Sequence, residues 1–326
     1  MSSLKQLFLM MSCALMLSFA AVEGHGQAVG AGRGDTAGSG GSRSIQGRVF
    51  FPDRGEGKTI RITIESPDVG TRSTVTDLDG GFIFNNLKPN TYQVTVEGGP
   101  DYETYRESVL IEGALVSKMV VHLQYKKGTG PVAGIPDEAL KFYRKGVDAS
   151  NKNDTSAAIE QLQQALTIDP TFGLAQNELG MVYLRQGDFE KAITNFVGAQ
   201  KHLPNSPMPF FNHGVVLIEQ KKFSDAKKPL QEALKRNDKL ASAHMYLGIA
   251  AVGLKDLAEA ESAFLKAVKL GGDSIARSHY YLGGIYWAKK ENKKAVDEME
   301  TYLKLRPNAP EADRLRKTIA DLRKNQ

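Results

Sequence analysis

Hydrophobic and polar positions alternate with a period of two through much of residues 44–124. Ile60, Ile62 and Ile64 are separated by polar side chains, and the same alternation surrounds Val94. Such alternation is typical of β-strands with one buried face. Seven short strands in this segment would favour a β-sandwich. The strands are predicted at residues 46–51, 60–64, 72–76, 82–84, 92–96, 106–111 and 118–123.

Beyond residue 135 the period of two is lost and the sequence repeats itself. Five glycines are spaced by 34, 34, 34 and 35 residues, and an alanine follows twelve residues after each of them. Four residues further on stands a larger apolar side chain, such as Leu162 or Phe264. Small residues at fixed positions suit a close crossing of two paired helices. One pair cannot bury its apolar face alone, so the pairs are expected to stack. The marker glycines are Gly146, Gly180, Gly214, Gly248 and Gly283.

The N-terminal residues predict export. Lys5 precedes a mostly apolar run from Leu7 to Val22, which is shorter than the ~20 residues of a spanning helix. Cleavage after Ala20, or a few residues later, fits the small residues there. We therefore expect a secreted or periplasmic protein with no transmembrane segment after signal removal. An uncleaved N-terminal anchor is the alternative.

Two parts of the chain resemble known families. The 34-residue pattern is similar to the tetratricopeptide repeat, in which stacked helix pairs form a superhelix. Residues 47–49, 76–84 and 87–92 resemble a carboxypeptidase regulatory-like domain, a transthyretin-like sandwich. That resemblance implies a non-catalytic module on a secreted protein. The tight turn at Asp79-Gly80 is expected to be the apex of a β-hairpin.

The expected fold is multidomain, with a small all-β sandwich followed by an all-α superhelix (α-solenoid). Its segments are a signal peptide at 1–20, a glycine-rich linker at 21–43, the β-sandwich at 44–124, a linker at 125–135, five repeats at 136–308 and a C-terminal capping helix at 309–326.

Charge and cysteine content narrow the classes of function. The single cysteine excludes an intramolecular disulfide and lies in the predicted signal. The net charge of +5 is too weak to predict nucleic-acid binding. Residues 1–135 contain 13 basic and 13 acidic residues, whereas residues 136–326 contain 29 and 24. The excess therefore belongs to the repeats, where paired lysines are expected to form a basic rim.

The tetratricopeptide resemblance implies that the first helix of each repeat lines a concave groove. In this chain the groove positions are mostly apolar, which favours a peptide or protein partner with hydrophobic anchors. Alternatively, these side chains pack between neighbouring helices, or the repeats self-associate. The predicted partner-binding residues are Tyr143, Asn177, Met181, Met208, Phe211, Met245, Tyr280 and Trp287.

No catalytic, cofactor or metal site is predicted. His244 and His279 occupy equivalent repeat positions about 10 Å apart by ordinary helix packing, too far for one zinc ion. Asp77 and Asp79 alone fall short of a calcium loop. The function expected is a non-enzymatic interaction scaffold. The alternative is an envelope module in which the β-sandwich recognises polysaccharide or a receptor and the repeats mediate assembly.

Overall fold

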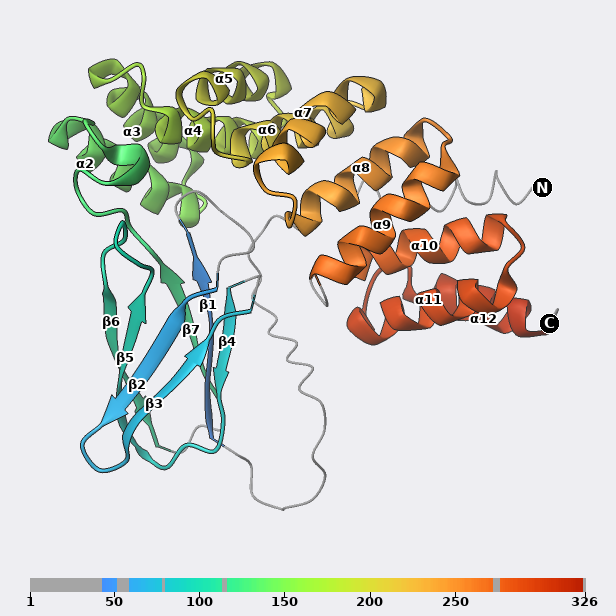
Figure 1. Ribbon diagram of the computed structural model, residues 1–326, viewed down its shortest axis with the longest axis horizontal. Coiled ribbons are helices and arrows are strands. Elements are labelled where there is room, and N and C mark those ends of the chain that lie inside the picture. The colour runs from blue at the N-terminus through green and yellow to red at the C-terminus, as the bar shows by residue number, and fades with distance from the viewer. Residues whose placement is uncertain (1–42, 52–58, 78–79, 113–115, 272–275, 325–326) are drawn as a thin grey trace. The chain divides into compact units, whose positions relative to one another are not determined.

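A computed structural model describes residues 43–51, 59–77, 80–112, 116–271 and 276–324 (Figure 1). The predicted signal peptide and nearly all of the glycine-rich linker lie outside these residues. The described part has the predicted class, a small β domain followed by an array of α-helices. Its residues form two compact units: an N-terminal unit within Gln27–Leu179 with Lys201–Pro204, and a C-terminal unit within Gly180–Gln200 with Asn205–Gln326.

All seven predicted strands are present, with ends within two residues of those expected. They alternate buried and exposed residues because successive side chains point to opposite faces of a sheet. The strands are β1 (Ser44–Phe50), β2 (Arg61–Ser66), β3 (Gly70–Val75), β4 (Gly81–Phe84), β5 (Asn90–Glu97), β6 (Tyr105–Ile111) and β7 (Val116–His122).

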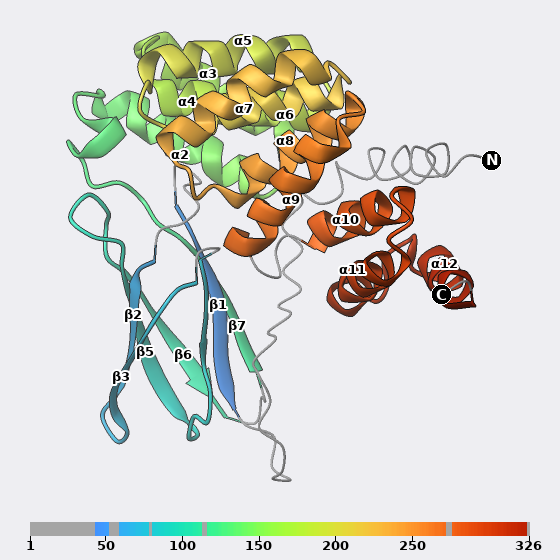
Figure 2. The same ribbon diagram turned by 45° about the vertical axis from the view of Figure 1, so that its right-hand side comes forward.

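The strands form two sheets, in the orders β4-β1-β7 and β3-β2-β5-β6 (Figure 2). In the three-stranded sheet, β1 runs antiparallel to β4 and parallel to β7. The core contains the inward-facing residues of both sheets, including Ile45, Ile64 and Tyr92, which are at most 1% exposed. The hydroxyl of Tyr92 donates to the carbonyl of Lys88 at 3.0 Å, which satisfies its buried polar atom.

The expectation of a β-hairpin at Asp79-Gly80 was wrong. Strands β3 and β4, which flank this turn, belong to different sheets, so the turn carries the chain from one sheet to the other. Asp79 lies outside the described residues. Gly80 has a φ of +80°, and its carbonyl accepts a 2.9 Å hydrogen bond from the amide of Val49 on β1.

The helices follow the predicted repeat pattern, with a first and a second helix in each of five repeats and one helix at the end. Each second helix buries its alanine and its larger apolar side chain against the first. The helices are α2 (Asp137–Asn151), α3 (Thr155–Ile168), α4 (Gly173–Gln186), α5 (Phe189–His202), α6 (Met208–Glu219), α7 (Phe223–Arg236), α8 (Ala241–Gly253), α9 (Leu257–Gly271), α10 (Ala276–Ala288), α11 (Asn292–Leu305) and α12 (Ala312–Lys324).

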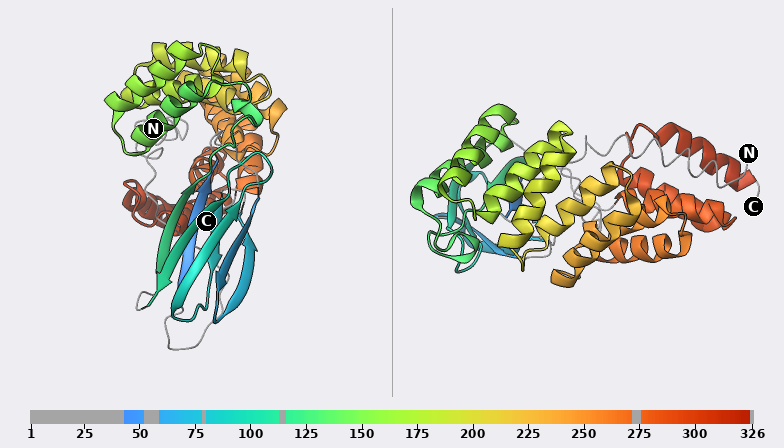
Figure 3. Two further views of the ribbon diagram at one scale, coloured as in Figure 1. Left: turned by 90° about the vertical axis from the view of Figure 1, so that its left-hand side faces the viewer. Right: turned by 90° about the horizontal axis from the view of Figure 1, so that it is seen from above.

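Within the C-terminal unit, neighbouring repeats stack through successive helices. Helix α7 contacts α8, α9 contacts α10, and α11 contacts α12 (Figure 3). Helix α12 buries Leu315, Ile319 and Leu322 on one face, as its sequence predicts, while most of its other residues are exposed. It therefore covers the apolar face of the last repeat with a largely polar surface.

The connection between β7 and α2 belongs to the N-terminal unit and is packed. Tyr125 stacks on Tyr102 with ring centroids 4.8 Å apart. Val132, in the short 3-10 helix η2 (Gly130–Val132), is 2% exposed. Arg144 on α2 donates to Glu103 at 2.9 Å and to the carbonyl of Tyr125 at 3.3 Å. This connection is therefore an ordered element of the N-terminal unit.

Candidate partner-binding site

The first helix of each repeat is positioned by its glycine. A Cβ atom added to Gly146, Gly180 or Gly248 would lie 2.7 Å from the side chain opposite it on the second helix. Real Cβ atoms essentially never approach so closely, so a larger residue would push the two helices apart. The glycines thus set the close crossing that determines which side chains of the first helices are covered.

In the N-terminal unit, both predicted partner-binding residues are buried. Tyr143 and Asn177 are each 5% exposed. The ring of Tyr143 packs against Phe172 with centroids 4.9 Å apart. Nearby, the buried Ser150 donates to the carboxylate of Glu178 at 2.7 Å. This part of the first-helix face consists of side chains that pack on one another.

In the C-terminal unit, the predicted residues divide into a covered and an accessible group. Met181 and Met208 are 4% and 5% exposed. Phe211, Met245 and Trp287 are only partly buried, and they come from α6, α8 and α10. We call these three residues the accessible apolar set.

Two of the three accessible side chains also pack against buried neighbours. Phe211 meets the ring of Tyr246 edge-on at 5.5 Å, so neighbouring repeats hold it in place. Met245 packs against a buried cluster that contains Ala241 and Ala267. A partner that contacted this set would therefore meet side chains whose rotamers are already restricted, which lowers the entropy lost on binding.

Tyr280 is used by the end of the array itself. It is 4% exposed, and its hydroxyl accepts a 3.1 Å hydrogen bond from Arg314 on α12. Its ring packs against Tyr302, whose hydroxyl donates to Glu311. Burial and this hydrogen bond hold the pKa of Tyr302 far above its usual range. The structure thus places Tyr280 in the packing of the C-terminal cap.

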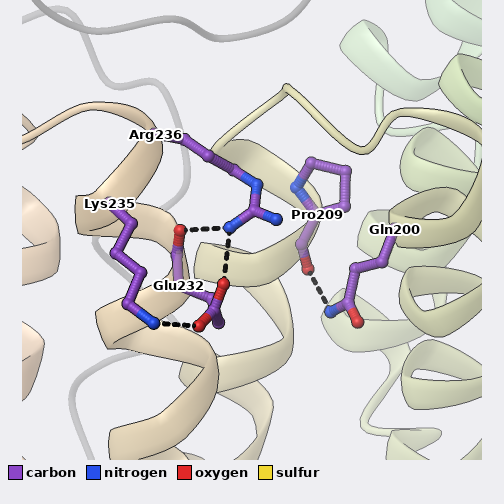
Figure 4. A network of polar contacts seen from close by, with 5 residues as sticks. All are labelled: Gln200, Pro209, Glu232, Lys235 and Arg236. Carbon is purple, nitrogen blue, oxygen red and sulfur yellow. Dashed lines mark hydrogen bonds and ion pairs between the residues drawn. The ribbon is translucent and has the colours of Figure 1, made fainter.

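One polar cluster at the end of α7, next to the start of α6, was missed by the sequence analysis (Figure 4). Glu232 accepts from Lys235 at 2.6 Å and from Arg236 at 2.8 Å, which lowers its pKa to about 2. The guanidinium of Arg236 lies 3.7 Å from the ring centroid of Phe210, a cation–π contact. The sequence signal for this cluster was Phe210, which is adjacent to the groove residue Phe211, together with Arg236 at the end of the second helix of the same repeat.

The basic residues near the helix turns are partly neutralised between repeats. Lys227 on α7 pairs with Glu259 on α9 at 2.6 Å, and Lys289 after α10 pairs with Glu261 on α9. Both pairs join neighbouring repeats, so these lysines help to align the stack. Exposed pairs of this kind contribute little stability each. The predicted rim therefore carries less unpaired charge than its lysine count indicates.

Two histidines of the repeats, the partly buried His213 and the buried His244, have lowered pKa values. His213 on α6 contacts Gln200 at 3.2 Å, and burial lowers its pKa. His244 on α8 donates to the carbonyl of Asp238 at 3.0 Å, and burial again lowers its pKa more than that bond raises it. The packing of the repeats therefore favours the neutral form of both side chains.

These shifts predict that mild acid weakens the repeats. A histidine with a lowered folded pKa stabilises the fold fully above the ordinary value of 6.5, and this stability is lost as pH falls through the folded pKa. The free energy of unfolding should therefore become smaller as the pH is lowered below 6.5. Urea titrations at a series of pH values would measure the slope, and His213→Gln with His244→Gln should flatten it. An equal slope in that double variant would contradict the assignment.

The described residues bring together no group of histidine, cysteine and carboxylate side chains able to hold a metal ion. A bilayer-spanning helix is likewise not found among the described residues.

Comparison with known proteins identifies the repeat family. A model described as tetratricopeptide repeat matches residues 134–207 and 211–275, and a second model with the same description matches residues 276–309. Together they cover more than half of the chain. The chain therefore belongs to the tetratricopeptide repeat family.

Individual relatives are distant and are matched over part of their length. Photosystem I assembly protein Ycf3 of Prochlorococcus marinus (strain MIT 9211) is 27% identical over 105 residues, which are 31% of this chain and 60% of that protein. Anaphase-promoting complex subunit CDC16 of Saccharomyces cerevisiae is 27% identical over 178 residues, 52% of this chain and 21% of that protein. The solved structure of the APC/C hetero-tetramer Cut9-Hcn1 is similar with a TM-score of 0.50 at 21% identity, covering 59% of this chain and 37% of that one. This last similarity shows the fold alone.

Proposed function

We propose that this protein is a non-enzymatic scaffold whose repeats bind a peptide or protein partner through the accessible apolar set. The observation that carries the proposal is that Phe211, Met245 and Trp287 remain partly exposed on the first helices of three consecutive repeats. Aromatic and methionine side chains are enriched at the centres of protein interfaces. Packed neighbours hold Phe211 and Met245 in place, which lowers the conformational entropy that these side chains would lose on binding a partner.

The family relationship supports binding rather than chemistry. Two of the similar proteins are named for assembly or for membership of a complex, a photosystem assembly protein and a subunit of the anaphase-promoting complex. The accessible apolar set of this chain consists of one phenylalanine, one methionine and one tryptophan. A partner with two or three apolar anchors at the spacing of neighbouring repeats fits it best.

Export and the nature of the β domain form a second part of the proposal. The basic and apolar N-terminal run supports passage across a membrane, hence a secreted or periplasmic scaffold. The motifs of residues 47–49, 76–84 and 87–92 support a carboxypeptidase regulatory-like domain, and the observed two-sheet fold is compatible with it. In this arrangement the β domain is an accessory module and the repeats capture the partner.

The test removes the exposed anchors while keeping the fold. Phe211→Ala with Met245→Ala should reduce capture of the native partner at least about tenfold, because truncation of anchor residues weakens interfaces by that amount or more. Partners would first be identified by crosslinking to the unaltered protein in its native envelope, and their capture then compared between variants. Far-ultraviolet circular dichroism should show unchanged helicity.

A control removes two exposed apolar side chains elsewhere on the repeats. Val197 on α5 and Leu265 on α9 are 48% and 45% exposed and lie on second helices. Val197→Ala with Leu265→Ala should leave capture unchanged. If both double variants lose capture equally, or if neither does, the accessible apolar set is not the binding site.

A further inference from the structure

The outer face of the three-stranded sheet exposes large apolar side chains to water. They come from all three strands, and they lie between residues whose side chains point into the core. Their exposed fractions are 56% for Val120, 43% for Val116, 41% for Ile83 and 37% for Phe50.

Strand register gathers these side chains into one surface. Arg48 lies opposite Val120 on the neighbouring strand, and Phe50 lies opposite His122, with their rings stacked 5.1 Å apart. Gln46 lies between Ile83 on one side and Lys118 on the other. Because adjacent strands are only about 4.8 Å apart, the whole set spans a narrow, nearly flat area. We call it the apolar–basic face.

The charges on this face have one sign. Arg48 and Lys118 are exposed, and neither makes an ion pair with any residue that the structure describes. Among the described residues of the three strands, the outward-facing positions include no carboxylate. The outer face of the four-stranded sheet differs, since Glu65 on β2 and Glu97 on β5 are at outward-facing positions.

We infer that the apolar–basic face is a peripheral binding surface for an anionic lipid bilayer. Lys and Arg side chains are attracted to anionic headgroups, while exposed valine, isoleucine and phenylalanine side chains can enter the interfacial region. A flat face with cations set among apolar groups satisfies both requirements at once. A second copy of the same face is a poorer occupant, because it would bring Arg48 and Lys118 against like charges. This inference is independent of partner binding by the repeats.

Vesicle partitioning tests the inference on the full chain. The probes are vesicles of phosphatidylcholine with 30% phosphatidylglycerol and vesicles of phosphatidylcholine alone, titrated around the lipid concentration that binds half of the unaltered protein. Arg48→Gln with Lys118→Gln should lower the partition coefficient on anionic vesicles about thirtyfold, because each cation contributes roughly fivefold. Val116→Ser with Val120→Ser should lower it several-fold on the same vesicles.

The matched control neutralises two arginines on the other sheet. Arg61 on β2 and Arg106 on β6 are exposed, so Arg61→Gln with Arg106→Gln changes the net charge equally. All variants carry the same apolar N-terminal run, so its contribution to the partition coefficient is the same in every variant. The control should lose less than about threefold, since long-range attraction is screened by salt. An unchanged partition coefficient in the Arg48 and Lys118 variant, or an equal loss in both charge variants, would overturn the inference; the first result would leave an acidic protein surface as the occupant.

Discussion

Phe264→Ala should lower the free energy of unfolding of the C-terminal repeats by about 3–5 kcal/mol, the cost of removing a fully buried phenylalanine. Phe264 is 0% exposed on α9. Its ring stacks on Tyr281 of the next repeat with centroids 4.9 Å apart, and it fills the space beside Gly248. The substitution therefore weakens both the helix pair and the contact between repeats.

The single tryptophan provides the measurement. Trp287 lies on α10, the helix that carries Tyr281, so its fluorescence reports unfolding next to the altered contact. The urea midpoint of this signal should fall strongly in Phe264→Ala. Leu265→Ala, at a 45% exposed neighbouring position, should shift it little. Equal shifts in the two variants would mean that the Phe264–Tyr281 contact does not join the repeats.

Gly80→Ala should be the most damaging small substitution in the β domain. A Cβ atom at this position would lie 2.2 Å from the carbonyl oxygen of Val49, and φ is +80°. The left-handed backbone alone costs about 1–2 kcal/mol for a residue with a Cβ. Overpacking against a backbone atom of β1 adds about 1–3 kcal/mol. The sheet-to-sheet turn should then detach from β1.

Gly70→Ala is the matched control for this prediction. Gly70 has nearly the same φ, +81°, but no atom lies within 4 Å of an added Cβ. Only the backbone cost applies there, and any gain from a less flexible unfolded chain is common to both variants. Hydrogen exchange of peptides covering β1 should accelerate much more in Gly80→Ala than in Gly70→Ala. Similar exchange in both would show that the close approach to Val49 is not limiting.

Side chains on the first helices of the repeats differ in their exposure. Met181, Met208 and Tyr280 fill space within the array, whereas Phe211 and Met245 are partly exposed at similar repeat positions. The repeat position alone therefore does not decide whether a side chain can reach a partner. The neighbouring side chains decide whether a residue is covered. For example, Arg314 of the terminal helix donates a hydrogen bond to the hydroxyl of Tyr280.

The elements of this protein could be predicted from the sequence because their signals are local. A period of two around Ile62 and Val94 depends only on the alternation of side chains along a strand. The spacing of the five glycines depends on the need for close helix crossings, which recurs in every repeat. Strand positions, helix pairs and the terminal helix were therefore accessible from residue order alone.

Other features depended on contacts between residues distant in the sequence. The turn at Gly80 looks like a hairpin in isolation, yet it changes sheets because β4 pairs with β1 and β3 pairs with β2. The apolar–basic face arises only when β1, β4 and β7 are placed side by side in register. Strand partners and side-chain exposure are set by long-range packing, which no local pattern encodes.

The sequence by itself determined that this chain has a β domain followed by five tetratricopeptide-like repeats and a capping helix. Hydrophobic alternation predicted the strands, and the 34-residue spacing with its resemblance to the tetratricopeptide repeat predicted the helix pairs. The tertiary structure decided which apolar side chains stay exposed, since that depends on what each neighbouring helix or strand covers. Phe211 and Tyr280 occupy the same repeat position, and only the fold leaves the first partly exposed and buries the second.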